Sequence, residues 1–326
     1  MTQQSFVKRR ESFWNEFDAL VKGSKLKRSA NAARFPRRYR ELTQDLNTAR
    51  AHGFDPSLIE RLNSLVQEGN QILYSRRSWS LKAGAKFILS GFPCAVRSQW
   101  RSLLAALLLF YGMAVFFAVL NIRYPEMVFR IAAPDMVHSM EQMYDPQSLN
   151  FLKPREVRHD ADMFGYYIYN NISIAFCIFA GGILFGIGSI FILMINGITL
   201  GTIAAHMVNS GFGETFFPFV IGHSSFELTA IVLSAQAGLL LGFRFFVTKG
   251  LTRSASLKCA GESALPIIAG AAVMLVIAAT VEAFWSSRHE LPIAIRYAAG
   301  AAGWVLVLCY LTFAGRSSSS KEMQLR

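Results

Sequence analysis

His223, Glu227 and Glu282 are the residues of this chain whose types and positions best suit chemistry. Each lies in a long stretch that is otherwise uncharged. Ionisable side chains inside membrane helices are costly, and they are functional candidates by default. His223 and Glu227 are four residues apart, so they share one helical face. Such a group of side chains can bind a polar ligand, a partner segment or a cation.

The heights of the two carboxylates follow from the nearest flanking charges. Glu227 lies 17 residues before Arg244, and Glu282 lies 20 residues after Glu262. At the rise of a helix these separations are ~25 Å and ~30 Å, so both carboxylates fall near the outer leaflet. We predict an outward-opening polar pocket lined by Asn170, Asn171, His223, Glu227 and Glu282. The alternative is that these residues only contact water or headgroups and cross-link helices.

The sequence leaves metal binding open. One histidine and two glutamates can ligate zinc, but no HExxH or other close ligand pattern is present. Ser224 and Ser225 adjoin His223, yet neighbours on a helix point in different directions, which argues against a hydrolytic triad. The four cysteines show no CxxC spacing, so neither a redox pair nor a zinc knuckle is indicated. We predict no cofactor and no enzyme activity, with an intramembrane metal-dependent activity left open.

Uncharged runs predict the elements that carry these residues. The 326-residue chain is 52% hydrophobic and only 17% charged, whereas soluble chains carry about 25% charged residues. A membrane span needs about 20 apolar residues. We therefore expect an all-α, polytopic membrane protein with about six spans in a membrane domain at 102–316. The predicted spans lie near 102–122, 172–195, 198–213, 223–245, 263–284 and 294–315.

The boundary between the second and third spans is placed at the polar pair Asn196-Gly197. The short segment that follows, and a break at Pro218 and Gly222, resemble the discontinuous helices of transporters. The region 198–222 therefore either spans the membrane or re-enters it.

The N-terminal part is basic and amphipathic. Residues 1–102 hold 19 Lys/Arg and 8 Asp/Glu. Gly53 can end one helix, and Asp55 can cap another that begins at Pro56. We predict a cytoplasmic helical domain at 1–78. Its apolar stripes are Phe6, Phe13, Phe17 and Leu20; Tyr39, Leu42, Leu46 and Ala49; and Leu58, Leu62, Leu65 and Ile72. No stacking or recognition-helix pattern accompanies the charge, so we ascribe it to the anionic membrane surface and not to nucleic acid.

Residues 79–101 alternate aromatic and basic side chains, which is typical of an amphipathic helix in the headgroup region. Pro93 should kink or break this helix. The linker is equally compatible with a connector that positions the first span.

The placement of Lys and Arg predicts the orientation. The basic N-terminal domain, the loop between Arg244 and Lys258 and the tail at 317–326 should lie in the cytoplasm. The segment 123–165, in which acidic residues outnumber basic ones, should be an external helical insertion. Six crossings satisfy these assignments.

Three small-xxx-small pairs predict close helix packing in lipid. The residues assigned to helix packing are Gly182, Gly186, Asn196, Gly197, Gly201, Gly238 and Gly242.

The membrane half carries a set of short motifs: Asn170-Asn171-Ile172, Asn196-Gly197, Leu200-Gly201, His223 with Glu227-Leu228, Ala237-Gly238-Leu239 and Glu282-Ala283-Phe284. Through these motifs, and less specific ones along almost the whole chain, the sequence resembles the stage II sporulation protein M (SpoIIM-like) family of bacterial membrane proteins. Two turns depart from the family pattern, at Gly222-His223-Ser224 and at Lys249-Gly250-Leu251.

The resemblance implies a scaffold of the cell envelope in the bacterial inner (cytoplasmic) membrane, and the placement of Lys and Arg predicts that both termini are cytoplasmic. Sporulation members are understood to hold peptidoglycan-degrading enzymes in a complex. Non-sporulating relatives occur beside a MoxR-type AAA ATPase in their gene neighbourhoods. Besides the lipid bilayer, the expected partners are cell-envelope proteins and an AAA ATPase system. The sequence leaves a homo-oligomer open. The alternative function is a transporter or channel for a small solute or ion that uses His223, Glu227 and Glu282.

Overall fold

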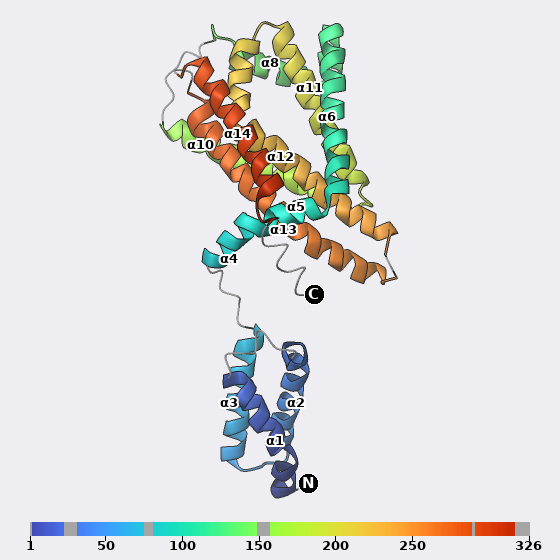
Figure 1. Cartoon of the computed structure of the whole chain (residues 1–326), viewed down its shortest axis with the longest axis vertical. Coiled ribbons are helices and arrows are strands. Elements are labelled where there is room, and N and C mark those ends of the chain that lie inside the picture. Colours follow the sequence, from blue (N-terminus) through green and yellow to red (C-terminus); the bar gives the residue numbers. More distant parts are fainter. Residues whose placement is uncertain are drawn as a thin grey trace. The chain divides into compact units, whose positions relative to one another are not determined.

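The computed structural model describes residues 2–22, 31–74, 81–148, 157–248, 250–288 and 291–316, and these residues form helices and no strand. The chain divides into two compact units, Met1–Leu81 and Lys82–Arg326 (Figure 1). The all-α prediction is confirmed. The predicted cytoplasmic tail at 317–326 and residues 75–80, which end the predicted N-terminal domain and begin the linker, lie outside the described residues.

The N-terminal unit is three helices around a core of large side chains. Its helices are α1 (Gln3–Lys22), α2 (Asn31–Ala51) and α3 (Pro56–Tyr74). The buried members of the predicted stripes are Phe6, Phe17, Leu42, Leu46, Ala49, Leu58, Leu62 and Leu65. Trp14 and Phe17 are fully buried. Trp14 was absent from the predicted stripes, and the side chain of Ile72 lies outside the described residues.

The turn between α2 and α3 forms as predicted. Gly53 has φ +61°, its N–H donates to the carbonyl of Arg50, and Phe54 N–H donates to that of Ala49. These two bonds form a Schellman motif that closes α2. Asp55 Oδ1 accepts from the Ser57 backbone N–H at 2.8 Å and so caps α3.

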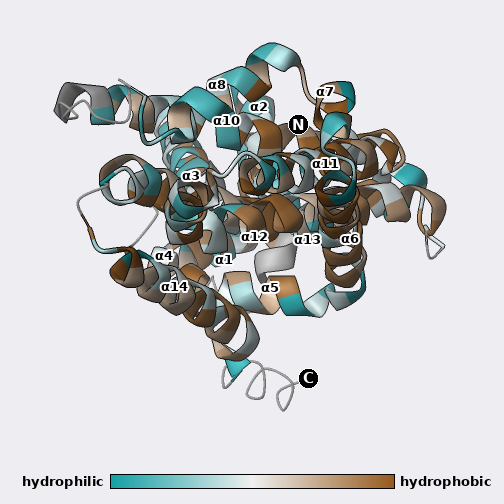
Figure 2. Cartoon of the chain, turned by 90° about the horizontal axis from the view of Figure 1, so that it is seen from above, coloured by the Kyte–Doolittle hydropathy of each residue, from teal (hydrophilic) through white to brown (hydrophobic). Residues whose placement is uncertain are grey.

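The described residues of the membrane unit include six helices that are long and apolar enough to cross a membrane. This confirms the predicted number of spans. Figure 2 shows hydrophobic brown along α6 and α14 and hydrophilic teal along α8. The spans are α6 (Trp100–Arg123), α10 (Val157–Ala180), α11 (Ile187–Asn209), α12 (Gly213–Phe246), α13 (Arg253–Val281) and α14 (Ile293–Phe313).

Helix α12 is the centre of the membrane unit. It packs against α6, α10, α11, α13 and α14, and it is the most buried of the six spans. In Figure 1, α6 and α11 lie side by side, and both α13 and α14 pack against α12. A residue on α12 can therefore meet residues from several other spans.

The segment before α6 is packed into the membrane unit. It consists of α4 (Leu81–Lys86), a π-helical turn η2 (Phe87–Gly91) and α5 (Phe92–Ser98). Phe92 and Val96 are buried, and Pro93 follows the π-helical turn. The Arg97 guanidinium donates to the carbonyls of Leu311 (2.6 Å) and Ala314 (2.7 Å). The helix α5 is thus packed into the membrane unit, whereas α4 buries no residue. The placement of residues 79–101 in the headgroup region stays a prediction.

Short helices follow α6: η3 (Pro125–Met127), α7 (Val128–Ile131) and α8 (Pro134–Tyr144). Two contacts dock α8 on the membrane unit. His206 Nε2 lies 2.8 Å from Glu141 Oε1, and Thr215 Oγ1 donates to the Tyr144 carbonyl at 2.5 Å. Residues 149–156 of the predicted insertion lie outside the described residues, and α10 already begins at Val157, within the range given to the insertion.

The predicted boundary at Asn196-Gly197 is wrong. The turn lies instead at η4 (Gly181–Ile183) and Gly186, which has φ +82°, and α11 runs unbroken through Asn196. The Asn196 side chain donates to the Ile192 carbonyl of its own helix at 2.8 Å. Small residues allow the close turn at 181–188, and no charge marks it, so the uncharged run concealed its position.

The predicted break at Pro218 and Gly222 is also wrong. After a turn at Gly211 (φ +82°), α12 continues from Gly213 through both residues. Pro218 is the sixth residue of α12, so its missing N–H removes one intrahelical hydrogen bond, yet the helix continues through it. The region 198–222 is thus the end of one span and the start of the next.

Candidate functional site

His223, Glu227 and Glu282 meet at one point of the membrane unit. His223 and Glu227 are on α12, and Glu282 begins η5 (Glu282–Ser286), a π-helical turn that continues α13. One ligand atom from each side chain lies within 4.8 Å of the others. His223 Nε2 is 3.5 Å from Glu227 Oε2. Two spans thus bring together the three residues that the sequence singled out.

Ser286 holds the other side of the imidazole. Its Oγ lies 3.2 Å from His223 Nδ1. Gly222 allows this approach, because a Cβ there would lie 2.7 Å from Ser286 Oγ. The sequence analysis missed Ser286, although it is four residues after Glu282 and so a candidate for the same helical face.

His223 and Glu282 are buried, Glu227 is partly buried, and the cluster is electrostatically unbalanced. His223 is 4% exposed and Glu282 is 8% exposed. Glu282 Oε2 has no hydrogen-bond partner in the described part of the chain. Two carboxylates this close in a buried site repel each other when both are ionised. The arrangement therefore favours a positively charged occupant or a shared proton.

Helix α14 adds two polar contacts that the sequence analysis missed. The Arg296 guanidinium donates to the Ser286 carbonyl at 2.7 Å. Trp304 Nε1 donates to Ser224 Oγ at 3.3 Å. Arg296 is buried. Arg296 lies three residues after the start of α14. This position could have marked it in the sequence, because a buried arginine at the end of a span needs partners.

Asn170 and Asn171 are placed differently from the prediction. They lie within α10 rather than at its start, because α10 begins at Val157. Asn170 Nδ2 donates to Asn171 Oδ1 at 3.0 Å, and Asn171 is buried. Among the described residues, neither asparagine hydrogen-bonds to the three clustered side chains. Their assignment to the pocket stays a prediction.

The predicted packing glycines lie at close helix contacts. A Cβ on Gly182 would collide with the backbone of Gly238, and one on Gly242 would collide with that of Gly186. These pairs join η4 and the turn that follows it to α12. Similar collisions place Gly197 against the Phe110 carbonyl and Gly201 against the Ala114 carbonyl of α6. The role of Asn196 in packing stays a prediction, since its side chain bonds to its own helix.

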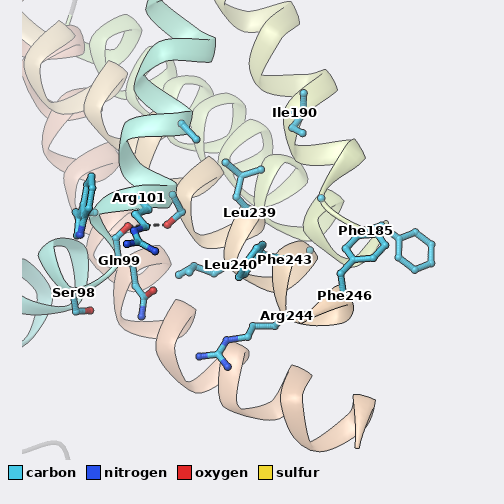
Figure 3. Close-up of a pocket in the computed structure, with 15 residues that line it drawn as sticks. Ser98, Gln99, Arg101, Phe185, Ile190, Leu239, Leu240, Phe243, Arg244 and Phe246 are labelled. Atoms are coloured by element: carbon cyan, nitrogen blue, oxygen red, sulfur yellow. Dashed lines mark hydrogen bonds between the residues drawn. The ribbon is translucent and has the colours of Figure 1, made fainter. Parts of the chain in front are cut away.

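A separate pocket lies at the other end of α12, with a volume of about 810 Å³. Figure 3 shows Gln99 and the guanidinium groups of Arg101 and Arg244 toward one side, and the rings of Phe185 and Phe246 toward the other. The fifteen lining residues include no acid. The sequence analysis did not predict this pocket, because it forms between residues far apart in the chain.

Two family models match parts of the chain. A family model described as stage II sporulation protein M matches residues 105–287. A second model, described as a domain of unknown function (DUF8413), matches residues 4–75. None of the curated proteins and none of the solved structures matches the chain. The first match contains the whole cluster of His223, Glu227, Glu282 and Ser286.

Proposed function

The chain belongs to the stage II sporulation protein M family, whose model covers more than half of it, and from this premise we propose a membrane scaffold. In this proposal the chain lies in a bacterial cytoplasmic membrane and couples its N-terminal helical domain to a process in the cell envelope. Both termini lie in the cytoplasm, and the polar cluster lies near the outer leaflet. The proposed role is not enzymatic.

The division into two units carries this proposal. The N-terminal unit has its own aromatic core, so its fold does not depend on contacts with the spans. The membrane unit holds the connecting segment firmly, because Phe92 is buried against Gly270 and Tyr310 and Arg97 binds the end of α14. A partner bound to the N-terminal unit would therefore be tethered to a fixed point of the membrane unit.

Charge supports the proposed orientation. The N-terminal region carries most of the net charge of +12. The first turns of α13, directly after the loop that follows α12, carry Arg253 and Lys258. Segments rich in Lys and Arg remain in the cytoplasm. The loop residue Lys249 lies outside the described residues.

A crosslinking pull-down from native membranes tests the scaffold. The full chain should recover one set of cell-envelope proteins and one set of cytoplasmic proteins. A chain that lacks residues 1–78 should lose only the cytoplasmic set. Recovery of identical proteins by both chains, or of none by the full chain, would contradict the proposal.

A transporter or channel is the second candidate function, and the buried ionisable cluster favours it. Purified protein in liposomes distinguishes the two functions. Reproducible solute or ion flux that is abolished by Glu227→Gln would support transport. Flux that is equal in protein-free liposomes would exclude this candidate for the solutes tested.

A further inference from the structure

We propose that His223, Glu227 and Glu282 form a binding site for a divalent transition-metal ion, with zinc as the best-suited ion. The site is within the membrane unit and its ligands come from α12 and η5. The inference goes beyond the scaffold proposal, because it rests on the geometry of this cluster and not on any partner of the chain.

The distances suit three ligands around one small ion. Zinc binds imidazole nitrogen and carboxylate oxygen at about 2.0–2.2 Å, so two ligands at tetrahedral positions are about 3.4 Å apart. His223 Nε2 and Glu227 Oε2 are already 3.5 Å apart. The whole set lies within 4.8 Å, so a shift of the Glu282 side chain on the order of 1 Å completes it. A fourth position remains for water or a ligand.

Ser286 orients the imidazole for this role. A metal-binding histidine usually engages its second ring nitrogen in a hydrogen bond, which fixes the ring and its tautomer. Here Nδ1 faces Ser286 Oγ at 3.2 Å, and Nε2 faces Glu227. When Nδ1 carries the proton and donates it to Ser286, the lone pair of Nε2 points into the cluster.

The unpartnered oxygen of Glu282 is the independent sign of a missing ligand. This side chain is more than nine-tenths buried, and its Oε2 accepts no hydrogen bond in the described part of the chain. Buried polar groups without a partner are rare and costly. A dication would bind this oxygen and would also remove the repulsion between the two carboxylates.

A second buried histidine of the same unit shows the contrast. His206 Nε2 pairs with Glu141 Oε1 at 2.8 Å and lies 3.3 Å from Ser210 Oγ. At that site a single carboxylate faces two histidines, because Glu141 Oε2 also lies 3.6 Å from His138 Nδ1. No second carboxylate is present there among the described residues to repel the first. The cluster at His223 has a second carboxylate, and no described lysine or arginine forms an ion pair with either of its glutamates.

The backbone adds a further indication. Glu282 and Ser286 are the first and last residues of η5. One π-helical turn therefore supplies both the hydroxyl beside His223 Nδ1 and the second carboxylate of the cluster. Such turns within α-helices occur frequently at functional sites. The π-helical turn is thus a local irregularity at the position where the cluster forms.

Zinc binding to the purified full chain tests this inference. The protein is stripped with a chelator in detergent micelles and titrated with Zn²⁺ alone. We expect about one ion per chain, with affinity at least about tenfold weaker in His223→Gln and Glu282→Gln. His206→Gln and Glu262→Gln are the matched controls, and they should bind as the unmodified chain does.

Two results would overturn the inference. One is an unmodified chain that binds no zinc in the concentration range of the titration, which would favour a shared proton between the carboxylates. The other is equal binding by all variants, which would mean adventitious sites elsewhere. Size-exclusion profiles identify variants that fail to fold, and Co²⁺ absorption of the unmodified chain then gives an independent readout of a site with few ligands. Failure here leaves the pull-down result unchanged.

We also infer that the pocket at Arg101 and Arg244 binds the headgroup of an anionic phospholipid. Basic pockets between spans on the cytoplasmic side bind such headgroups. Both guanidinium groups lack an ion pair among the described residues, and the lining contains no acid. Trp100, 57% exposed, lies beside them, as is usual for tryptophan at the level of the headgroups.

The shape of the lining suits a lipid better than a small anion. Phe185 and Phe243 are exposed and line the pocket together with Ile190 and Leu239. These side chains offer an apolar wall for an acyl chain. The arginines and Gln99 lie toward the other side of the pocket (Figure 3), where they would bind the phosphate. A soluble anion would use only the polar side.

Lipid-dependent thermal stability tests this second inference. Delipidated protein should gain more stability from phosphatidylglycerol than from phosphatidylcholine. The double variant Arg101→Gln with Arg244→Gln should lose this difference, whereas Arg288→Gln, which removes a charge elsewhere, should keep it. Equal stabilisation by both lipids, or an unchanged difference in the double variant, would contradict the inference. Free phosphate that reproduces the stabilisation would show that only an anion is bound.

Discussion

Each of the two units contains a carboxylate that is buried to the same extent, but the hydrogen bonding of the two carboxylates differs. Asp45 in the N-terminal unit and Glu282 in the membrane unit are each 8% exposed. Asp45 Oδ2 accepts hydrogen bonds from Arg10 Nε and Trp14 Nε1, both at 2.8 Å. Glu282 Oε2 accepts none among the described residues. Hydrogen bonds within the core satisfy the Asp45 carboxylate, whereas Glu282 has an oxygen that is free to bind a ligand.

The cores of the two units also differ in how they are packed. The N-terminal unit is filled by large side chains such as Trp14 and Phe17. In the membrane unit, backbones touch at small residues such as Gly182 and Gly238. In lipid the hydrophobic effect does not drive helices together, so van der Waals packing between closely approaching backbones stabilises their association instead. The membrane unit should therefore tolerate added volume least.

Gly238→Ala should have the largest effect on stability. A Cβ at this position would collide with Ser189 Oγ and would lie 2.9 Å from the Ile178 carbonyl. We expect a loss of about 3 kcal/mol or more, or no folded protein. Thermal unfolding in detergent measures the loss. Gly112→Ala is the matched control, because its added Cβ meets nothing within 4 Å. Equal stability of the two variants would contradict the close packing.

Asp45→Ala should have the next largest effect, confined to the N-terminal unit. It leaves the buried Trp14 Nε1 without an acceptor, which costs about 1–3 kcal/mol. Hydrogen exchange of α1, α2 and α3 in the full chain measures the change, and the exposed Glu60→Ala is the control. Unchanged protection in Asp45→Ala would show that Asp45 is not structural.

Glu282→Gln should change the stability of the metal-free chain little or should raise it. The substitution removes the repulsion with Glu227, and no hydrogen bond to Oε2 is lost. The thermal unfolding temperatures of the Glu282→Gln and Asp45→Ala variants, measured under the same conditions, compare the two carboxylates directly. A loss as large as that of Asp45→Ala would mean that Glu282 is also a finished structural group, and the difference between the two carboxylates would disappear.

The smallest effect concerns the cap of α3. The Ser57 hydroxyl and then its backbone N–H hold the pKa of Asp55 below its ordinary value. The carboxylate therefore stabilises α3 at pH values above the ordinary pKa, and the stabilisation is lost as the pH falls through the lowered pKa. Hydrogen exchange at the start of α3 should rise in that acidic range. Ser57→Ala should shift the rise to higher pH, and an unchanged profile would contradict the role of the hydroxyl.

The sequence predicted the parts of the fold that depend on local patterns. The apolar stripes, the cap at Asp55 and the turn at Gly53 need only neighbouring residues. The i, i+4 spacing and the distances to flanking charges likewise predicted that His223, Glu227 and Glu282 would lie at similar heights. Convergence of these three residues was thus accessible from spacing alone.

Other features depend on contacts that no local pattern specifies. The turn at Gly186 is hidden because the run from 163 to 213 contains no charge, and Asn196 satisfies its amide within the helix. Ser286 and Arg296 join the site through the packing of η5 and α14 on α12. The pocket at Arg101 and Arg244 depends on the bend between α5 and α6, and the periodicity of apolar residues does not predict this bend.

X-ray absorption of the zinc-loaded full chain tests the central claim most directly, namely that His223, Glu227 and Glu282 form a metal site. The account predicts one imidazole nitrogen and carboxylate oxygens at about 2.0–2.2 Å, with no sulfur ligand. The imidazole signal should disappear in His223→Gln and remain in His206→Gln. A fully hydrated ion, a sulfur ligand at about 2.3 Å, or a spectrum that depends on His206 would contradict the account.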